Sequence, residues 1–219
     1  AQDSSAYGMD FKSKTNIITL LEKIKPLAGK NRWIRILYSQ PRPILLDVAD
    51  FLISNEGFAP YLDVPIQHIS KKILKLMNRN TNTGDIIRKL KQKNIFLRTT
   101  VMTGFPSETK KDFNELYSFL QEIEFDHLGA FAFSPEEGTK AFKMDKKVSK
   151  KTAEERLDMI MTNQAIISRK KLQRMVGQKM AILVEGKDEN GCFSGRHIGQ
   201  APEIDGVVML KNPLKKGKI

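Results

Sequence analysis

Apolar residues follow two different spacings over the first two thirds of the 219-residue chain. Short segments rich in β-branched and aromatic residues, at 33–38, 61–64, 95–102 and 128–133, predict strands. Between them, apolar residues recur at helical spacing over 44–55, 70–77, 85–93 and 110–123. The strand centres recur at about the length of one βα unit. This alternation predicts an α/β fold with a parallel sheet, which we interpret as part of a TIM-type (β/α) barrel.

The segment 97–109 (LRTTVMTGFPSET) predicts a strand that ends in a tight turn and leads into a capped helix. Gly104 and Pro106 end the strand, and Thr109 with Asp112 has the spacing of a capping box. Parallel α/β proteins bind ligands at the carboxyl ends of their strands, and this turn presents Glu108 there. Glu108 is therefore interpreted either as an exposed residue beside a helix cap or as a ligand contact.

The pattern changes near Ser149, which predicts the start of a long helix that reaches about Met175 and is followed by Gly177. Segments 180–185, 192–197 and 206–210 then predict short antiparallel strands, and Asn190-Gly191 predicts a hairpin turn between the first two. We expect three parts: a partial barrel over 1–148, a connecting helix over 149–176, and a β module over 177–219 that is too short to close.

The chain carries a formal net charge of +12, from 27 lysines and 10 arginines against 25 acidic residues. Lysine is a solvated point charge, so part of this excess is consistent with an ordinary charged surface. Half of the excess falls in residues 149–219, which predicts that this tail docks an anionic partner such as ribosomal RNA.

Cysteine use and hydropathy restrict the class of protein. The single cysteine, Cys192, excludes an internal disulfide framework and favours a reducing compartment. The apolar runs are too short to span a membrane, and residues 1–8 lack the pattern of a signal peptide. A cytoplasmic protein with no membrane partner is expected.

Every predicted strand of the partial barrel is followed by polar residues together with glycine or proline. Gly and Pro let the backbone approach a ligand closely at such ends. Gln67 and His68 follow the second strand, although a single histidine is more often a structural residue. His127 lies at the opposite end of its strand and is given no catalytic role.

Several strings resemble the radical S-adenosylmethionine methylthiotransferases. They are 1–10 (AQDSSAYGMD), 61–68 (YLDVPIQH), 98–109 (RTTVMTGFPSET) and 133–139 (FSPEEGT). The segment 201–208 (APEIDGVV) resembles the RNA-binding-type β-barrel, the TRAM domain, that ends those enzymes. Gln2-Asp3, Glu136-Glu137 and 201–203 are similar to the branch that methylthiolates the β-carbon of an aspartate on small-subunit ribosomal protein twelve.

The resemblance implies a partial barrel that binds S-adenosylmethionine across the carboxyl edge of its sheet, with iron–sulfur clusters and an external electron donor. It implies ribosomal protein twelve as the protein partner, and Glu136 and Glu137 as residues that contact this basic substrate. The candidate cofactor-binding residues are Gln2, Asp3, Gln67, His68, Arg98, Thr100, Gly104, Glu108 and Ser134.

The chain departs from this family in lacking the cysteine-rich segments that hold the clusters, because one cysteine cannot supply several thiolates. We therefore expect an internal fragment that contributes no metal ligand and is inactive alone. Two alternatives stay open: a fragment of a tRNA adenosine methylthiotransferase, and a non-catalytic protein that binds the ribosome or RNA.

Overall fold

A computed structural model describes residues 3–12, 14–29, 32–187, 191–212 and 216–217. Four parallel strands form its first sheet: β1 (Ile34–Ile36), β2 (Phe58–Asp63), β3 (Phe96–Thr103) and β4 (His127–Ala132). They lie side by side in chain order, as β1-β2-β3-β4. The predicted α/β fold with a parallel sheet is confirmed.

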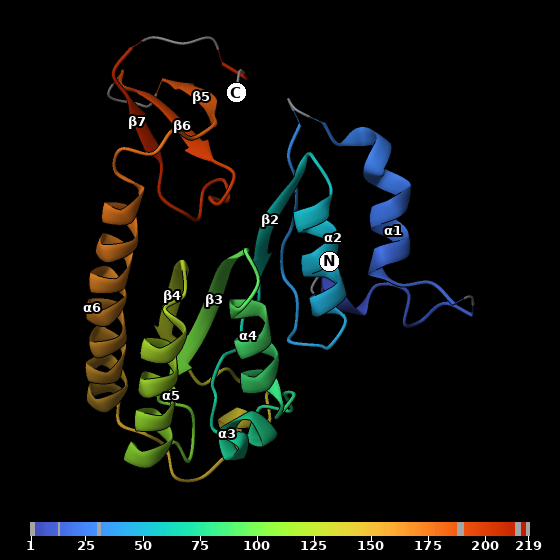
Figure 1. Cartoon of the computed structure of the whole chain (residues 1–219). Coiled ribbons are helices and arrows are strands. Elements are labelled where there is room, and N and C mark those ends of the chain that lie inside the picture. The colour runs from blue at the N-terminus through green and yellow to red at the C-terminus, as the bar shows by residue number, and fades with distance from the viewer. Residues whose placement is uncertain (1–2, 13, 30–31, 188–190, 213–215, 218–219) are drawn as a thin grey trace.

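Helices connect these strands and lie on one side of the sheet (Figure 1). They are α2 (Leu45–Ser54), α3 (Lys71–Leu76), α4 (Thr83–Lys91) and α5 (Lys110–Ile123). The predicted capping box is present, because the Thr109 side chain accepts from the Asp112 amide and the Asp112 side chain accepts from the Thr109 amide. This reciprocal cap starts α5 at the predicted residue.

Burial along β3 shows which side of the sheet holds the core. Its residues alternate between half-buried and buried, as expected for a strand with two different faces. Leu97 and Val101 pack in a single apolar cluster with helix residues such as Leu116 and Leu120. The opposite face, which carries Arg98 and Thr100, is therefore free of these helices. We call it the concave face.

Short elements precede the first strand and follow the last. They are η1 (Ser4–Ala6), α1 (Ile17–Ile24), η2 (Lys25–Leu27) and, after β4, η3 (Ala141–Lys143), where η denotes a 3-10 helix. The sequence prediction did not include α1. Its Ile17 and Leu21 are buried in the same core as the strands, so the helix covers the side of α2.

The long helix α6 (Lys150–Met175) begins at its predicted cap, Ser149, and packs along β4. It ends at an antiparallel sheet of β5 (Ile182–Lys187), β6 (Phe193–His197) and β7 (Val208–Leu210). The predicted hairpin turn at Asn190 lies outside the described residues. No helix in the described part of the chain is long and apolar enough to cross a bilayer.

The β module lies at the amino ends of the parallel strands, and α6 runs to it from their carboxyl ends (Figure 1). Ala59 and Tyr61 of β2 form a second small apolar cluster with Ala201 of the module, and Phe96 and Ile198 pack against it. The amino end of the sheet is thus covered, and ligands must reach the concave face elsewhere.

The close approach of α6 to the turn after β3 depends on Gly104. Its φ is +76°, and a Cβ added there would lie 2.4 Å from the Ala153 Cβ. We expect Gly104→Ala to lower the free energy of unfolding by about 3 kcal/mol, since it adds backbone strain to a steric clash. Gly138→Ala is the control, because Gly138 has a φ of +82° but no other described atom within 4 Å of such a Cβ. Urea unfolding of both variants measures the difference, and equal losses would contradict the packing role.

Candidate functional site

Polar and small residues line the concave face near the middle of β3 and β4. A Cβ added to Gly129 would lie 3.7 Å from the Arg98 guanidinium and 3.8 Å from the Thr100 hydroxyl, so the three residues share this face. In the sheet register, Arg98 is opposite Asp63 on one side and His127 on the other. The absence of a side chain at Gly129 leaves room above Thr100.

Five polar side-chain atoms at the carboxyl end of the sheet, in or after β1, β2 and β3, are buried without a hydrogen bond to the described residues. Two of them, His68 Nε2 and Glu108 Oε1, face each other at 4.0 Å. The other three are Ser39 Oγ, Asp63 Oδ1 and Gln67 Oε1. The backbone holds them in place, because the Ser39 amide donates to the Asp63 carbonyl at 2.9 Å and the Gln67 amide donates to the Thr100 carbonyl at 2.9 Å. Buried polar atoms are nearly always satisfied in a working protein. Their position at the strand ends fits a polar ligand.

Asp63 was not among the predicted site residues, although it stands within the family-like string 61–68. Burial raises the pKa of this carboxyl, and the nearby Asp205 carboxylate raises it further. The Tyr38 amide, which donates to Asp63 Oδ2 at 3.2 Å, and the Arg98 guanidinium, 3.9 Å from Oδ1, act in the opposite direction. A buried carboxyl with a perturbed pKa beside a charged partner at a strand end is a candidate for a functional site.

Arg98 is held by the β module. Its guanidinium lies 2.5 Å from Oδ1 of Asp205, whose side chain is fully buried. Asp205 also accepts from the Tyr61 hydroxyl at 2.8 Å and from the Ala201 amide at 2.8 Å, and its carboxylate lies 3.3 Å from His127 Nδ1. Burial and the Asp205 carboxylate raise the pKa of Tyr61, which keeps its hydroxyl a donor. Asp205 therefore joins the module to β2, β3 and β4.

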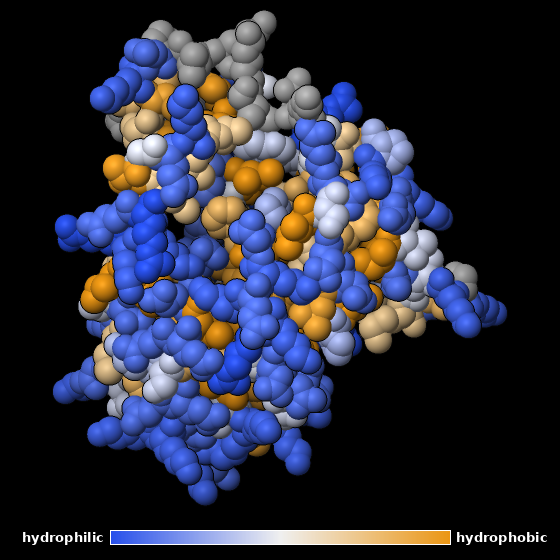
Figure 2. Space-filling view, in the orientation of Figure 1, coloured by the Kyte–Doolittle hydropathy of each residue, from blue (hydrophilic) through white to orange (hydrophobic). Residues whose placement is uncertain are grey.

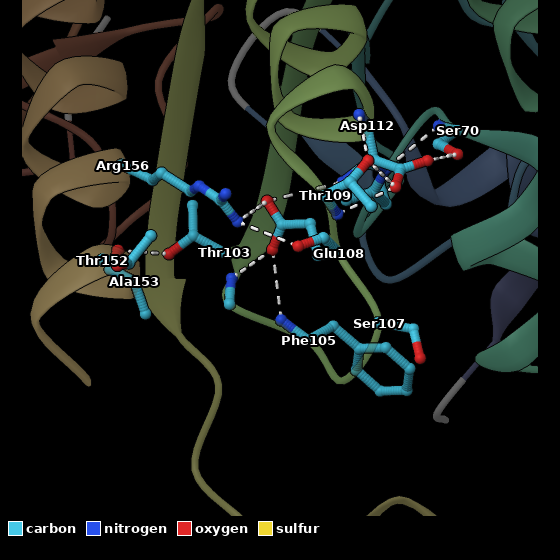
Figure 3. A network of polar contacts seen from close by, with 12 residues as sticks. Ser70, Thr103, Phe105, Ser107, Glu108, Thr109, Asp112, Thr152, Ala153 and Arg156 are labelled. Carbon is cyan, nitrogen blue, oxygen red and sulfur yellow. Dashed lines mark hydrogen bonds and ion pairs between the residues drawn. The ribbon is translucent and has the colours of Figure 1, made fainter. Parts of the chain in front are cut away.

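Glu108 lies in the turn after β3, with its side chain fully buried (Figure 3). Its Oε2 accepts from the amides of Gly104 and Phe105, the latter at 3.2 Å. Its Oε1 lies 3.2 Å from Arg156 Nη1 on α6, and the same nitrogen donates to the Glu108 carbonyl at 3.3 Å. Oε2 is thus hydrogen-bonded within the turn, and Oε1 is ion-paired with Arg156 without forming a hydrogen bond, an arrangement that supports a role in positioning the turn.

His68 stands beside this carboxylate and is itself fully buried. Its Nδ1 accepts from the amides of Ile69 and Ser70, at 2.9 and 3.0 Å, which places the proton of the neutral ring on Nε2. That Nε2 lies 4.0 Å from Glu108 Oε1. The structure therefore groups His68 and Glu108 behind the strand ends, where both support the loops after β2 and β3.

Asp3 holds the loop after β1, much as His68 and Glu108 support the loops after β2 and β3. It accepts from the amides of Ser5 and Gln40, each at 3.0 Å, and from the Arg42 side chain at 3.2 and 3.3 Å. Burial alone would raise the pKa of Asp3, but the hydrogen bonds from Ser5, Gln40 and Arg42 outweigh it and hold the pKa below its usual value. Asp3 joins the first segment to the loop after β1. Gln2 lies outside the described residues.

The segment after β4 carries the other candidates. Ser134 is exposed and lines a cavity of about 460 Å³ together with Gly104, Phe133 and Lys147. Glu136 and Glu137 are also exposed, and the Glu136 carbonyl accepts from the Thr139 hydroxyl in a tight turn. Both carboxylates are therefore available to a partner.

A metal cluster has no ready set of ligands here. Within the described residues, no group of three or more His, Cys, Asp or Glu side chains is placed to hold a metal ion. Cys192 lies beside β6, in the module that covers the opposite end of the sheet. The described residues therefore offer no ligand set for an iron–sulfur cluster, whereas the strand-end acceptors fit an organic ligand.

Two family models match the chain. A model described as the radical SAM superfamily matches residues 5–120, and one described as the TRAM domain matches residues 176–219. The first covers more than half of the chain. Its span includes Asp3's partners, the strand ends of β1 and β2, and the turn at Glu108.

Several similar proteins carry the same name. A protein of Clostridium kluyveri named ribosomal protein uS12 methylthiotransferase RimO is 42% identical over 219 residues, which span 97% of this chain and 48% of that protein. The Thermotoga maritima protein of the same name is 41% identical, over 100% of this chain and 51% of its own. The chain thus spans about half the length of the curated relatives it matches.

A solved structure agrees with the fold. Coproporphyrinogen III oxidase HemN of Escherichia coli, described as a radical SAM enzyme, superposes with a TM-score of 0.53 over 83% of this chain and 51% of its own. The sequences are 17% identical, so this similarity concerns the fold alone.

The positioning role of Glu108 predicts a loss of stability when its charge is removed. We expect Glu108→Gln to lower the free energy of unfolding by about 3 kcal/mol, because Arg156 loses its buried partner and an amide nitrogen competes for the turn amides. Glu115→Gln, an exposed glutamate on α5, is the matched control. Thermal unfolding and S-adenosylmethionine binding would both be measured in the full-length protein. Unchanged stability with weaker binding would instead favour the direct cofactor contact predicted from the sequence.

Asp205 is expected to hold the β module in place. Asp205→Asn leaves the Arg98 guanidinium without its buried countercharge, which should cost about 3 kcal/mol. Glu203→Gln removes the same charge from an exposed residue nearby and should have little effect. The release of the module is measured by limited proteolysis, as the rate of cleavage in the segment between α6 and β5. Equal protease resistance of the two variants would contradict this role.

Proposed function

The chain belongs to the radical SAM superfamily, and we propose that it is the part of a methylthiotransferase that modifies an aspartate of ribosomal protein uS12. The observation that carries this proposal is the identity of about 40% that extends over the whole chain, barrel part and β module alike. The relatives that show it share the uS12 name, which favours this reading over the tRNA-modifying and the non-catalytic alternatives. The transferred group is methylthio and the acceptor is the β-carbon of the aspartate.

We propose that S-adenosylmethionine binds at the carboxyl edge, between the loops after β1 and β2 and the concave face of β3. When bound, it supplies the radical chemistry for which the superfamily is named. It carries amino and hydroxyl donors, which suit the unpartnered acceptors of Ser39, Asp63 and Gln67. Thr100 and Arg98 line the adjacent face, and Ser134 lies at the end of β4.

The remaining predicted residues are proposed to hold this edge in shape. Asp3 fixes the loop after β1, His68 the loop after β2, and Glu108 with Gly104 the turn after β3. Rigid support of this kind is what a site needs to orient a cofactor and keep water from a reactive species. The iron–sulfur ligands are proposed to come from parts of the full-length protein beyond this chain.

Glu136 and Glu137 are proposed to contact the substrate. Both are exposed on the segment after β4, at the same edge as the proposed cofactor site. Carboxylates there attract a basic loop of a ribosomal protein. The full-length enzyme would also meet an electron donor, and its TRAM domain suggests contact with RNA in the cytoplasm.

Charge reversal tests both the substrate and the residues that contact it. The full-length protein with Glu136→Lys and Glu137→Lys should modify uS12 several-fold less, since each lost attraction is worth about 0.5–1 kcal/mol and repulsion is added. The control reverses Glu22 on α1 and Glu115 on α5, two exposed glutamates on other helices. Mass spectrometry of uS12 measures the modified fraction of its aspartate. If the wild-type full-length protein modified a tRNA adenosine and did not modify uS12, the proposed function would be overturned.

A further inference from the structure

Ten exposed lysines surround the turn after β3 at the carboxyl end of the sheet, and we call this surface the lysine face. They are Lys71, Lys75, Lys110, Lys111, Lys140, Lys143, Lys146, Lys147, Lys150 and Lys151. They come from α3, from α5, and from the segment that leads from η3 into α6. The corresponding end of the molecule is predominantly hydrophilic in Figure 2.

Specific contacts bring these segments together around the turn. The Ser107 amide donates to the Lys146 carbonyl at 2.9 Å, and Lys72 Nζ donates to the Ser107 carbonyl at 2.8 Å. Arg156 of α6 donates to the carbonyl of the next residue, Glu108. One turn of five residues therefore contacts the starts of α3 and α6 and the segment between β4 and α6, so lysines distant in sequence form one surface.

The positive charge of the chain is most dense here and not in the β module. Residues 140–151 contain six lysines and one aspartate, a net charge of +5 over twelve residues. Residues 176–219, which the TRAM model matches, contain seven basic and five acidic residues, a net charge of +2. The sequence predicts residues 149–219 as the anion-binding surface, and Lys150 and Lys151 at the start of that segment belong to the lysine face. The lysine face is therefore a second candidate beside the β module.

Internal ion pairs do not account for these lysines. Lys110, Lys111, Lys143 and Lys146 form no ion pair with any described residue, while Lys150 and Lys151 only approach Glu154 and Glu155 at 3.7 and 4.0 Å. Lys110 and Lys111 stand in the first turn of α5, where the helix dipole disfavours cations. Fold stability therefore gives no reason for this arrangement, and an external anion does.

The chemistry of the surface favours RNA over other partners. Unpaired lysines bind phosphates as point charges without reading sequence. The four apolar residues within 140–151 are half-buried, so the surface offers no large apolar group to insert into a membrane. A free basic protein would be repelled, apart from the local acidic pair Glu136-Glu137.

We propose that the lysine face binds the phosphate backbone of RNA at the edge of the sheet where the cofactor is proposed to bind. The enzyme would then bind the substrate protein together with the RNA that surrounds it. Glu136 and Glu137 would contact the protein, and the lysines would contact the RNA phosphates. That this RNA is ribosomal rests on the proposed function, whereas the binding surface itself does not.

The test uses the full-length protein with Lys110, Lys111, Lys143 and Lys146 changed to Gln. A matched variant changes four lysines of the β module, Lys179, Lys187, Lys211 and Lys216, to Gln. Fluorescence anisotropy with a labelled single-stranded RNA of twenty nucleotides gives Kd at several salt concentrations. We expect Kd to rise about tenfold or more in the lysine-face variant, and the slope of log K against log salt to fall by about 3, because four phosphate contacts are lost.

Arginine replacements at the same four positions keep the charge and should restore binding, which separates charge loss from misfolding. An RNA affinity within twofold of wild type in the lysine-face Gln variant would overturn the proposal, as would loss of RNA binding in the β-module variant alone. Loss of binding to phosphatidylserine vesicles without loss of RNA binding would also overturn it. Modification of uS12 by the same variants reports separately on the proposed function, which stands if the lysine face fails.

Discussion

The carboxylate of Glu108 joins parts of the chain that are far apart in sequence. It accepts from two amides of its own turn, pairs with Arg156 at the start of α6, and faces the buried ring of His68 after β2. Gly104 lets Ala153 approach the same turn without a steric clash. The loops at the carboxyl end of the sheet, including the lysine face, take their positions from this buried cluster, because α3, α5 and α6 all begin against it.

The two ends of the sheet differ in how completely their buried acceptors are satisfied, although the donor Arg35 Nε on the module side also lacks a hydrogen bond within the described residues. At the amino end, Asp205 is surrounded by donors from Tyr61, Arg98 and Ala201, and the β module covers the strands. At the carboxyl end, side-chain oxygens of Ser39, Asp63 and Gln67 form no hydrogen bond within the described residues, and Asp63 Oδ1 only approaches the Arg98 guanidinium at 3.9 Å. Buried unsatisfied acceptors are costly unless a ligand or water completes them. This contrast assigns the module a structural role at one end and leaves the other end for ligands.

Local signals in the sequence predicted most of the α/β elements, although they missed α1 and placed the start of β2 three residues late. Alternating periodicity placed the strands and helices, and the Thr109–Asp112 spacing predicted the start of α5, because these features depend on neighbouring residues. The bonds of Asp205 to Tyr61 and Arg98 span more than 100 residues and have no local signal. The packing role of Gly104 could not be predicted either. A glycine that leaves space for a ligand and one that leaves space for the Ala153 side chain cannot be distinguished in a sequence. Asp63 could have been predicted as a site residue, because it lies in the string 61–68 that resembles the family.

The central claim is that the cofactor binds at the carboxyl edge, whereas the β module covers the amino end and does not contact the cofactor. Hydrogen–deuterium exchange of the full-length protein, with and without S-adenosylmethionine, tests it directly. The account predicts slower exchange on cofactor binding in peptides covering 38–40, 63–67 and 98–102, whose amides and side chains surround the unpartnered acceptors. Exchange in 196–206 should not change. Protection confined to 196–206, with none at the three strand ends, would contradict the account.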